Sequence, residues 1–192
     1  MSPDRPRGEP AQAAAEAGVA EDPEPPSRRD SPAGLVLDVL EEAGDWSRVP
    51  GREAEIRAAA AALCRHPEAK AGAGRAATIV LTDDASVRKL NGAYRGKDQA
   101  TNVLSFPFEA PPGTGDETAR DYLGDVVLAA ETVLREADEM GVPPGHHLQH
   151  LVIHGLLHLL GFDHVEDGEA EAMEAIETEV LKGIGIADPY AA

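Results

Sequence analysis

The chain has 192 residues, with 35 Asp and Glu against 17 Lys and Arg and a formal net charge of −18. Such acidity disfavours naked nucleic acid as a partner, because proteins that bind phosphate usually carry a basic surface. The single cysteine, Cys64, excludes an intramolecular disulfide and fits a reducing compartment. No apolar run approaches the roughly 20 residues of a membrane span. Residues 1–10 lack the hydrophobic core of a secretory signal, so we expect a cytoplasmic protein.

Positive charge is concentrated in one short stretch. Arg88, Lys89, Arg95 and Lys97 fall within ten residues, whereas the chain after residue 161 has a single cation. A polyanion would therefore have to be bound locally, at this stretch. Composition alone favours the simpler interpretation that these cations are a solvated helix end and loop.

The N-terminal segment differs from the rest of the chain. Residues 1–33 hold seven of the fifteen prolines and no aromatic residue. Such a segment cannot bury enough apolar surface to offset its conformational entropy. We therefore predict a disordered tail over residues 1–33 and a folded domain over residues 34–188.

Strands and helices are mixed in the first half of the domain. A short apolar run at residues 34–39 predicts a first strand, and the β-branched segment 76–82 predicts a second. Between them, residues 52–65 are rich in alanine with apolar positions at helical spacing, which predicts a helix. Asp83 and Asp84 can then cap a further helix, because an Asp side chain accepts hydrogen bonds from a first helical turn.

The second half continues in the same way. Residues 102–108 and 123–128 predict two more strands, and residues 131–140 predict an amphipathic helix. Residues 143–161 and 168–183 predict the last two helices. The inward face of the final helix is expected to hold Ala172, Met173, Ile176, Val180 and Leu181. This order predicts an α+β fold: a single domain with one small mixed sheet of about four strands packed by helices.

Two histidines of the predicted helix 143–161 have surroundings that favour metal binding. Residues 151–160 read LVIHGLLHLL, in which every residue except His154 and His158 is apolar or glycine. A helix that is apolar on nearly all sides is buried, and residues four apart lie on one face. Two buried imidazoles side by side are costly unless their nitrogens are satisfied, and a metal ion satisfies them.

His164 is the third candidate ligand. Gly161 can end the helix and let the backbone reverse, so that the next turn brings His164 back toward the first two histidines. Three histidines with an open fourth position are typical of catalytic zinc sites. We therefore predict one Zn²⁺ per chain, held by His154, His158 and His164. Asp163 or another carboxylate could hold one imidazole through its second nitrogen.

The alternative is a set of core histidines that are hydrogen-bonded to the backbone. The spacing H-x3-H-x2-G-x2-H, in an apolar helix followed by a glycine turn, favours the metal site. His147 and His150 lie nearer the polar start of the same helix. They are expected to line the pocket rather than to bind the metal.

The run HGLLHLLGFDH has the spacing of the H-E-x-x-H-x-x-G-x-x-H motif of metzincin proteases. In those proteases the Glu after the first His is the general base, whereas this chain has Gly155. Glycine cannot move a proton, and in a helix interior it costs about 1 kcal/mol relative to alanine. Gly155 therefore argues against peptide hydrolysis, and it predicts close packing against the sheet or room for a bulky substrate.

Three segments in the same order resemble the bacterial YbeY family of endoribonucleases and ribosomal-RNA maturation factors. They are LNGAYRGKDQATNVLSFPFE (90–109), YLGDVVLAAETV (122–133) and HGLLHLLGFDH (154–164). The last segment matches the signature H-G-x-L-H-L-x-G-[YF]-D-H, and Met173 and Glu177 stand where the family has M-x-x-x-E. Ala100 replaces a usual proline, which could loosen the loop, and Asn102 replaces a frequent aspartate.

The resemblance implies an α+β fold, one zinc ion on His154, His158 and His164, and cleavage of single-stranded RNA. It also implies a role in forming the 3′ end of 16S rRNA and in ribosome quality control. The ribosome or ribosomal proteins would be partners, and no DNA substrate is expected. The functional arginine of the family's R-G-K-D motif falls on Arg95, whose guanidinium could clamp phosphate oxygens.

Two other functions stay open at this point. One is a non-catalytic ribosome-assembly factor in which zinc only holds the fold, and the net acidity suits binding to basic ribosomal proteins. The other, less favoured, is a zinc peptidase that takes its general base from elsewhere in the chain.

Overall fold

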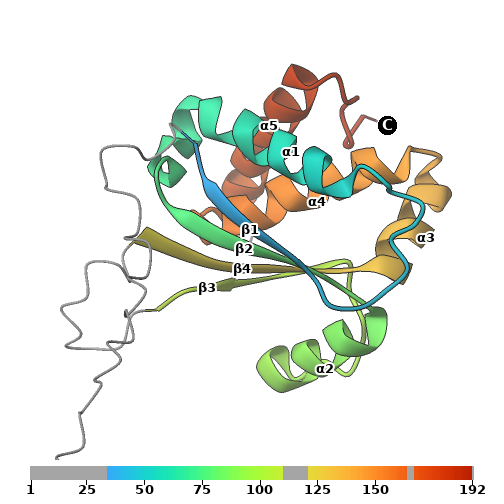
Figure 1. Cartoon of the computed structure of the whole chain (residues 1–192). Helices are drawn as coiled ribbons and strands as arrows, with labels where there is room; N and C mark the ends of the chain where they lie inside the picture. Colours follow the sequence, from blue (N-terminus) through green and yellow to red (C-terminus); the bar gives the residue numbers. More distant parts are fainter. Residues whose placement is uncertain (1–33, 110–120, 164–166, 192) are drawn as a thin grey trace, which may run out of the picture. The chain divides into compact units, whose positions relative to one another are not determined.

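The computed structural model describes residues 34–109, 121–163 and 167–191 (Figure 1). The predicted tail lies outside these residues. The strands are β1 (Val36–Glu41), β2 (Ala76–Thr82), β3 (Val103–Pro107) and β4 (Tyr122–Ala129). They form one sheet in the order β1-β2-β4-β3. β2 pairs in parallel with β1 and β4, and β3 is antiparallel to β4. The mixed four-stranded sheet confirms the predicted fold class.

The helices are α1 (Arg52–Arg65), η2 (Pro67–Gly72, a 3₁₀ helix), α2 (Asp84–Arg95), α3 (Ala130–Met140), α4 (Pro144–Leu159) and α5 (Asp167–Gly183). Asp83 caps α2 as predicted, because its carboxylate accepts a hydrogen bond from the Ser86 N–H at 2.7 Å. Gly96 ends α2 with a φ of 67°, a conformation that suits glycine. η2 was not predicted, and it continues the chain after α1 has ended before Pro67. None of the described helices is long and apolar enough to cross a membrane.

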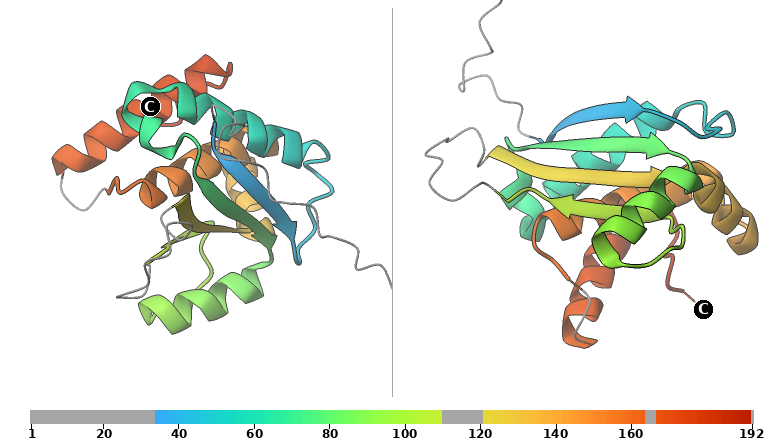
Figure 2. Two further views of the ribbon diagram at one scale, coloured as in Figure 1. Left: turned by 60° about the vertical axis from the view of Figure 1, so that its left-hand side comes forward. Right: turned by 90° about the horizontal axis from the view of Figure 1, so that it is seen from below.

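The sheet is covered unequally on its two faces. α1, α4 and α5 lie over one face and α2 lies under the other (Figures 1 and 2). α4 is central, since it packs against α1, α3, α5, β3 and β4. Its side chains Leu148, Ile153, Leu156 and Leu157 are fully buried. The predicted buried helix is thus the one on which the sheet and the other helices of that face converge.

One prediction about α5 is wrong. Ala172 was expected to face inward but is exposed, while Met173, Ile176 and Val180 are buried. The position that shares the buried face with them is Glu177, which has no exposed surface. The buried face of α5 therefore includes a carboxylate, which the predicted set of apolar inward residues did not contain.

α4 approaches the sheet closely at Gly155. A Cβ atom at this position would lie 2.5 Å from Cγ1 of Val126 and 3.2 Å from the hydroxyl oxygen of Ser105. The Ser105 hydroxyl donates a hydrogen bond to the carbonyl oxygen of Gly155 at 3.1 Å. Of the two reasons predicted for a missing side chain, close packing against the sheet is the one observed.

We expect Gly155→Ala to destabilise the protein, although alanine is the better helix former. Overpacking against Val126 costs about 1–3 kcal/mol and the gain in helix propensity returns about 1 kcal/mol, so the free energy of unfolding should fall by up to about 2 kcal/mol. Gly92→Ala in α2 is the matched control, because its Cβ would meet only the Lys97 carbonyl at 4.0 Å. Urea unfolding should show the control unchanged or stabilised, and equal effects in the two variants would contradict the steric explanation.

Candidate metal centre

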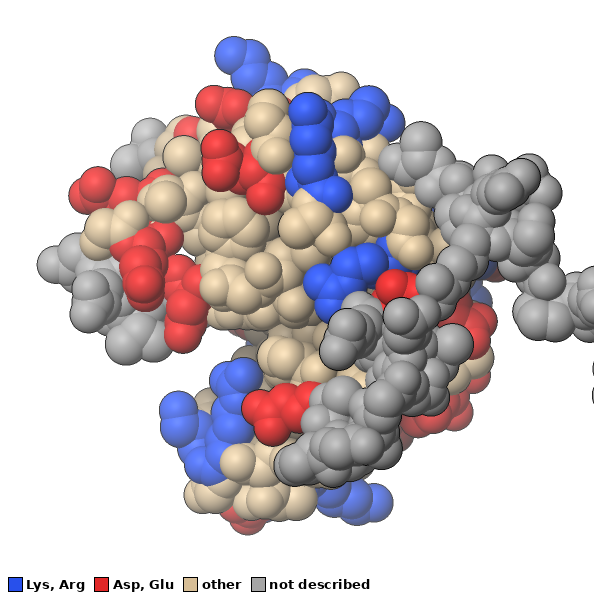
Figure 3. Space-filling model, turned by 90° about the vertical axis from the view of Figure 1, so that its left-hand side faces the viewer, with Lys and Arg blue, Asp and Glu red and all other residues tan. Residues whose placement is uncertain are grey.

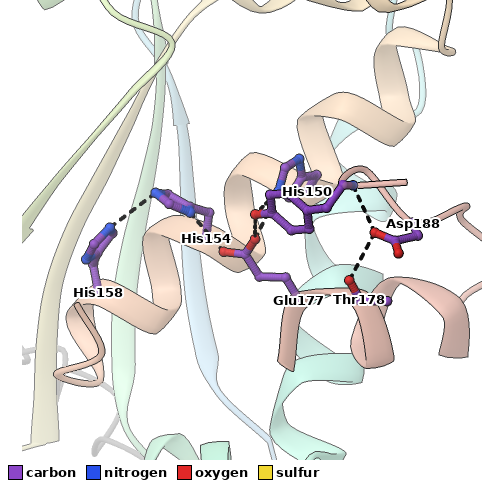
Figure 4. Close-up of polar contacts among 7 residues, drawn as sticks. His150, His154, His158, Glu177, Thr178 and Asp188 are labelled. Atoms are coloured by element: carbon purple, nitrogen blue, oxygen red, sulfur yellow. Dashed lines mark hydrogen bonds and ion pairs between the residues drawn. The ribbon is translucent and has the colours of Figure 1, made fainter. Parts of the chain in front are cut away.

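His154 and His158 meet on one face of α4, as their spacing predicted. Their Nε2 atoms are 3.1 Å apart, and the two rings stand edge to face with centroids 4.7 Å apart (Figure 4). Both side chains are partly exposed to solvent at this face. The pair is therefore embedded in an apolar helix and yet accessible from outside.

The second nitrogen of each ring is held by an acceptor. His154 Nδ1 donates to Glu177 Oε1 at 2.8 Å, and His158 Nδ1 donates to the carbonyl oxygen of Phe162 at 3.0 Å. A carbonyl oxygen and an ionised carboxylate can only accept, so both Nδ1 atoms carry the hydrogen. In each neutral ring Nε2 is then the acceptor, and two acceptors face each other at 3.1 Å.

This arrangement fits a metal ion. Two facing acceptors repel each other unless a proton or a cation lies between them. Two bonds of about 2.0–2.1 Å from zinc at the tetrahedral angle put their nitrogens about 3.3 Å apart, close to the separation of these Nε2 atoms. A metal-binding histidine commonly donates its other N–H to a carboxylate or a backbone carbonyl, and these two histidines do so.

The predicted third ligand, His164, lies outside the described residues. Among the residues that the structure does describe, no group of three His, Cys, Asp or Glu side chains is arranged to hold a metal. The structure thus brings His154 and His158 together, and the assignment of all three histidines as ligands stays a prediction. The carboxylate that accepts the hydrogen bond from His154 Nδ1 is that of Glu177. This residue matches the glutamate of the family's M-x-x-x-E motif, and the sequence predicted no role for it.

Glu177 joins three elements through one buried carboxylate. Its Oε2 accepts hydrogen bonds from His150 Nε2 at 3.1 Å and from the Tyr190 hydroxyl (Figure 4). Burial raises the pKa of this carboxyl, but the hydrogen bonds from His150, His154 and Tyr190 outweigh it and lower the pKa to about 2. Glu177 is therefore ionised at neutral pH. A buried negative charge at the Nδ1 atom of His154 favours a cation at the paired Nε2 atoms.

Tyr190 reaches this centre because the segment after α5 folds back. Asp188 accepts hydrogen bonds from the Thr178 hydroxyl at 3.1 Å and from the Tyr190 N–H at 2.8 Å. The Tyr190 ring then stands edge to face against His150, with centroids 5.7 Å apart. No prediction from the sequence placed Tyr190 at this centre. The dipeptide Asp-Pro at residues 188–189 was the available signal, since it favours a turn.

Two adjoining cavities include His154 in their walls. The first, which we call the Arg95 cavity, has a volume of about 600 Å³ and is lined by Arg95, Asn102, His154 and His158 among others. The second, the Tyr190 cavity, has about 430 Å³, and its lining includes Tyr190, His147 and His150. Both include Asn102, Val103 and His154 in their walls. His147 and His150 thus line the Tyr190 cavity and are not among the described residues that line the Arg95 cavity.

The predicted basic stretch divides between two places. Arg95, at the end of α2, lines the Arg95 cavity and is the one described lining residue there with a positive charge. Arg88 instead forms a two-pronged ion pair with Asp98, with both N–O distances 2.6 Å. Lys89 and Lys97 are exposed and are not among the described residues of this lining. In Figure 3, Lys and Arg side chains lie at both the upper and the lower end of this face, and a group at the lower left lies beneath a hollow in the surface.

Comparisons with known proteins agree on one family. The sequence profile described as endoribonuclease YbeY matches residues 47–185. Proteins named endoribonuclease YbeY are 48% identical over 157 residues in Bradyrhizobium sp. strain BTAi1, 49% over 171 residues in Parvibaculum lavamentivorans and 50% over 159 residues in Azorhizobium caulinodans. These matches cover 81%, 85% and 82% of this chain and 92%, 89% and 97% of the relatives. The solution structure of TM1509 from Thermotoga maritima is 22% identical, with a TM-score of 0.47, over 82% of this chain and 100% of that one.

We expect Glu177→Gln to destabilise the protein in the presence of a chelator. The amide cannot accept from three donors, because one of its two polar atoms is itself a donor. A buried donor left without a partner costs about 1–3 kcal/mol, and the free energy of unfolding should fall by that amount. Glu171→Gln, at an exposed position of the same helix, is the matched control. Chemical denaturation that finds the two variants equal would show that the Glu177 hydrogen bonds contribute nothing net.

Proposed function

The chain belongs to the endoribonuclease YbeY family, and we propose that it is a zinc-dependent endoribonuclease that cuts single-stranded RNA. We further propose that it acts in the cytoplasm on the 3′ end of 16S rRNA and in ribosome quality control. Two features support the proposal: the match to the family profile over residues 47–185 and the facing Nε2 atoms of His154 and His158 beside Arg95. The second feature carries the chemistry.

Zinc is the metal that we assign to this centre. His154 and His158 would hold it, with His164 as the third ligand. When bound, zinc supplies Lewis acidity, which activates water near neutral pH and stabilises negative charge on a phosphoryl oxygen. Glu177 and the Phe162 carbonyl keep the two imidazoles in one tautomer and one orientation through their Nδ1 atoms.

Arg95 is assigned to the phosphate. It stands in the wall of the same cavity as His154 and His158, and a guanidinium presents parallel N–H donors to two phosphate oxygens. Charge that develops on those oxygens during hydrolysis would be stabilised by these donors. Arg95 gives a chain with a net charge of −18 a local positive group with which to bind an RNA strand, although the cavity lining also includes Asp163.

The acidity of the remaining chain supports a protein partner as well. Basic ribosomal proteins are suited to such a surface, so we propose the ribosome as the setting in which the RNA is presented. A non-catalytic assembly factor would share this partner but would need no accessible histidine pair. Peptide hydrolysis is disfavoured by the packing of Gly155, because a carboxylate side chain at that position would meet Val126 in β4.

We expect His158→Ala to remove both zinc and RNA cleavage. Two ligands hold a metal far more weakly than three, so the zinc content should fall from one per chain to near zero. His146→Ala is the matched control, on the same helix but exposed and outside the Arg95 cavity. Metal analysis and a cleavage assay on a single-stranded RNA oligonucleotide measure the two effects.

Three outcomes of that experiment would contradict the proposed function or the proposed metal site. Lost zinc with unchanged RNA processing would support the non-catalytic assembly factor. Chelator-sensitive cleavage of casein without cleavage of RNA would support the peptidase. A full complement of zinc in His158→Ala would show that the metal is held elsewhere.

We expect Arg95→Ala to lower kcat/KM for RNA by about 10²–10³-fold, the usual effect of removing one stabilising donor, with zinc content unchanged. Arg95→Lys should recover part of the activity, because a lysine supplies the charge without the two-pronged geometry. Arg88→Ala is the control, since that arginine is engaged by Asp98. Equal activity of Arg95→Ala and the wild type would remove Arg95 from the mechanism.

A further inference from the structure

Apart from His154, the residues that line the Tyr190 cavity have no part in the cleavage chemistry proposed above, and its walls differ from those of the Arg95 cavity. No Lys or Arg is found among the described residues that line it, whereas Glu136 and Glu139 are. A phosphate group would be repelled here. An occupant must therefore be uncharged at this point, or carry hydrogen-bond donors toward the carboxylates.

Ring and thioether surfaces make up much of the remaining wall. The Tyr190 ring is 42% exposed and Met140 is 50% exposed, so both present apolar surface to the cavity and to solvent. His150 stands edge to face with Tyr190. Rings of this kind are the surfaces on which single-stranded nucleic acid stacks its bases, and a volume of about 430 Å³ is in the range of small-ligand sites.

The carboxylate of Glu136 is fixed at one side of this cavity. Its Oε2 accepts hydrogen bonds from Asn102 Nδ2 and from His147 Nε2, both at 2.9 Å. A carboxylate that is held in place favours ligands with N–H donors. Adenine, cytosine and guanine carry an exocyclic amino group and uracil does not.

The position of the cavity fits an RNA strand. It shares Asn102, Val103 and His154 with the Arg95 cavity, so the two cavities adjoin at the candidate metal centre. An enzyme that cuts within a strand must hold nucleotides on both sides of the cut. One of the two adjoining cavities offers an arginine for phosphate, and the other offers rings and carboxylates for a base.

We propose that the Tyr190 cavity binds one unpaired nucleobase next to the bond that is cut, and that it selects bases with an exocyclic amino group. This inference rests on the proposed RNA cleavage. Tyr190 supplies stacking surface, and Glu136 and Glu139 accept from the base edge.

The first test compares two variants that differ only in the ring. Tyr190→Phe and Tyr190→Leu both lose the hydroxyl that contacts Glu177, but only the leucine variant loses the aromatic surface. The probe is a single-stranded RNA with 2-aminopurine at the nucleotide flanking the cut, and stopped-flow fluorescence records binding before cleavage. We expect Tyr190→Leu to bind about tenfold more weakly than Tyr190→Phe. Equal affinities would overturn the stacking role.

The second test does not depend on the folding of a Tyr190 variant. Two otherwise identical RNA substrates carry adenosine or purine riboside, which lacks the amino group, at the same flanking position. We expect wild-type protein to cut the adenosine substrate about tenfold faster, as for a hydrogen bond to a charged acceptor. Glu139→Gln should reduce this ratio and Glu171→Gln should not. A ratio near one in the wild type would overturn the proposed selectivity.

Failure of the proposed function would look different from failure of this inference. The wild type could cut neither substrate while Tyr190→Phe still binds the 2-aminopurine strand more tightly than Tyr190→Leu does. In that case the base site stands and the nuclease assignment falls. If both substrates are cut at the same rate and the two Tyr190 variants bind alike, the nuclease stands and the base site falls.

Discussion

A carboxylate with no exposed surface must be surrounded by hydrogen-bond donors, and the arrangement around Glu177 follows from that constraint. Three donors converge on it: His150 and His154 from α4, and Tyr190 from the segment after α5. Each of these bonds fixes something else. The bond to His154 sets its tautomer, and the bond to Tyr190 holds that ring at the edge of a cavity. The candidate metal centre and both neighbouring cavities are therefore organised around one buried charge.

The distribution of charge reconciles an acidic chain with an anionic substrate. The net charge of −18 is a property of the whole sequence, whereas binding depends on the field within a few ångströms of the site because salt screens longer distances. At the histidine pair one neighbouring cavity is lined by Arg95 together with Asp163, and the other by Glu136 and Glu139 without a Lys or Arg among its described residues. Such a surface would bind the phosphate of an RNA strand in one cavity and a base in the adjoining one. The remaining acidic surface would then be available to bind proteins.

Local patterns in the sequence predicted most elements and part of the site. The i,i+4 spacing of His154 and His158 determines that they share a face, and the strands and helices follow from apolar periodicity with bounds that shift by one or two residues. The contacts of Glu177 and Tyr190 were beyond prediction because their partners lie 13 to 40 residues away in the chain. The glycine at position 155 indicated that no side chain fits there. Only the distance to Val126 shows that the reason is close packing against the sheet and not space for a substrate. Ala172 was assigned to the wrong face of α5 because apolar character alone does not show that the buried face of this helix includes the carboxylate of Glu177.

The fit between Gly155 and β4 also bears on how such a centre could change over evolution. Three histidines at this spacing are one substitution away, on paper, from the motif of a metalloprotease. In this fold the substitution is blocked by its neighbour, because any side chain at residue 155 collides with Val126 unless the strand residue shrinks first. The two positions are thus epistatic, and a mutational path from one chemistry to the other would have to pass through a change in the sheet before it reached the helix.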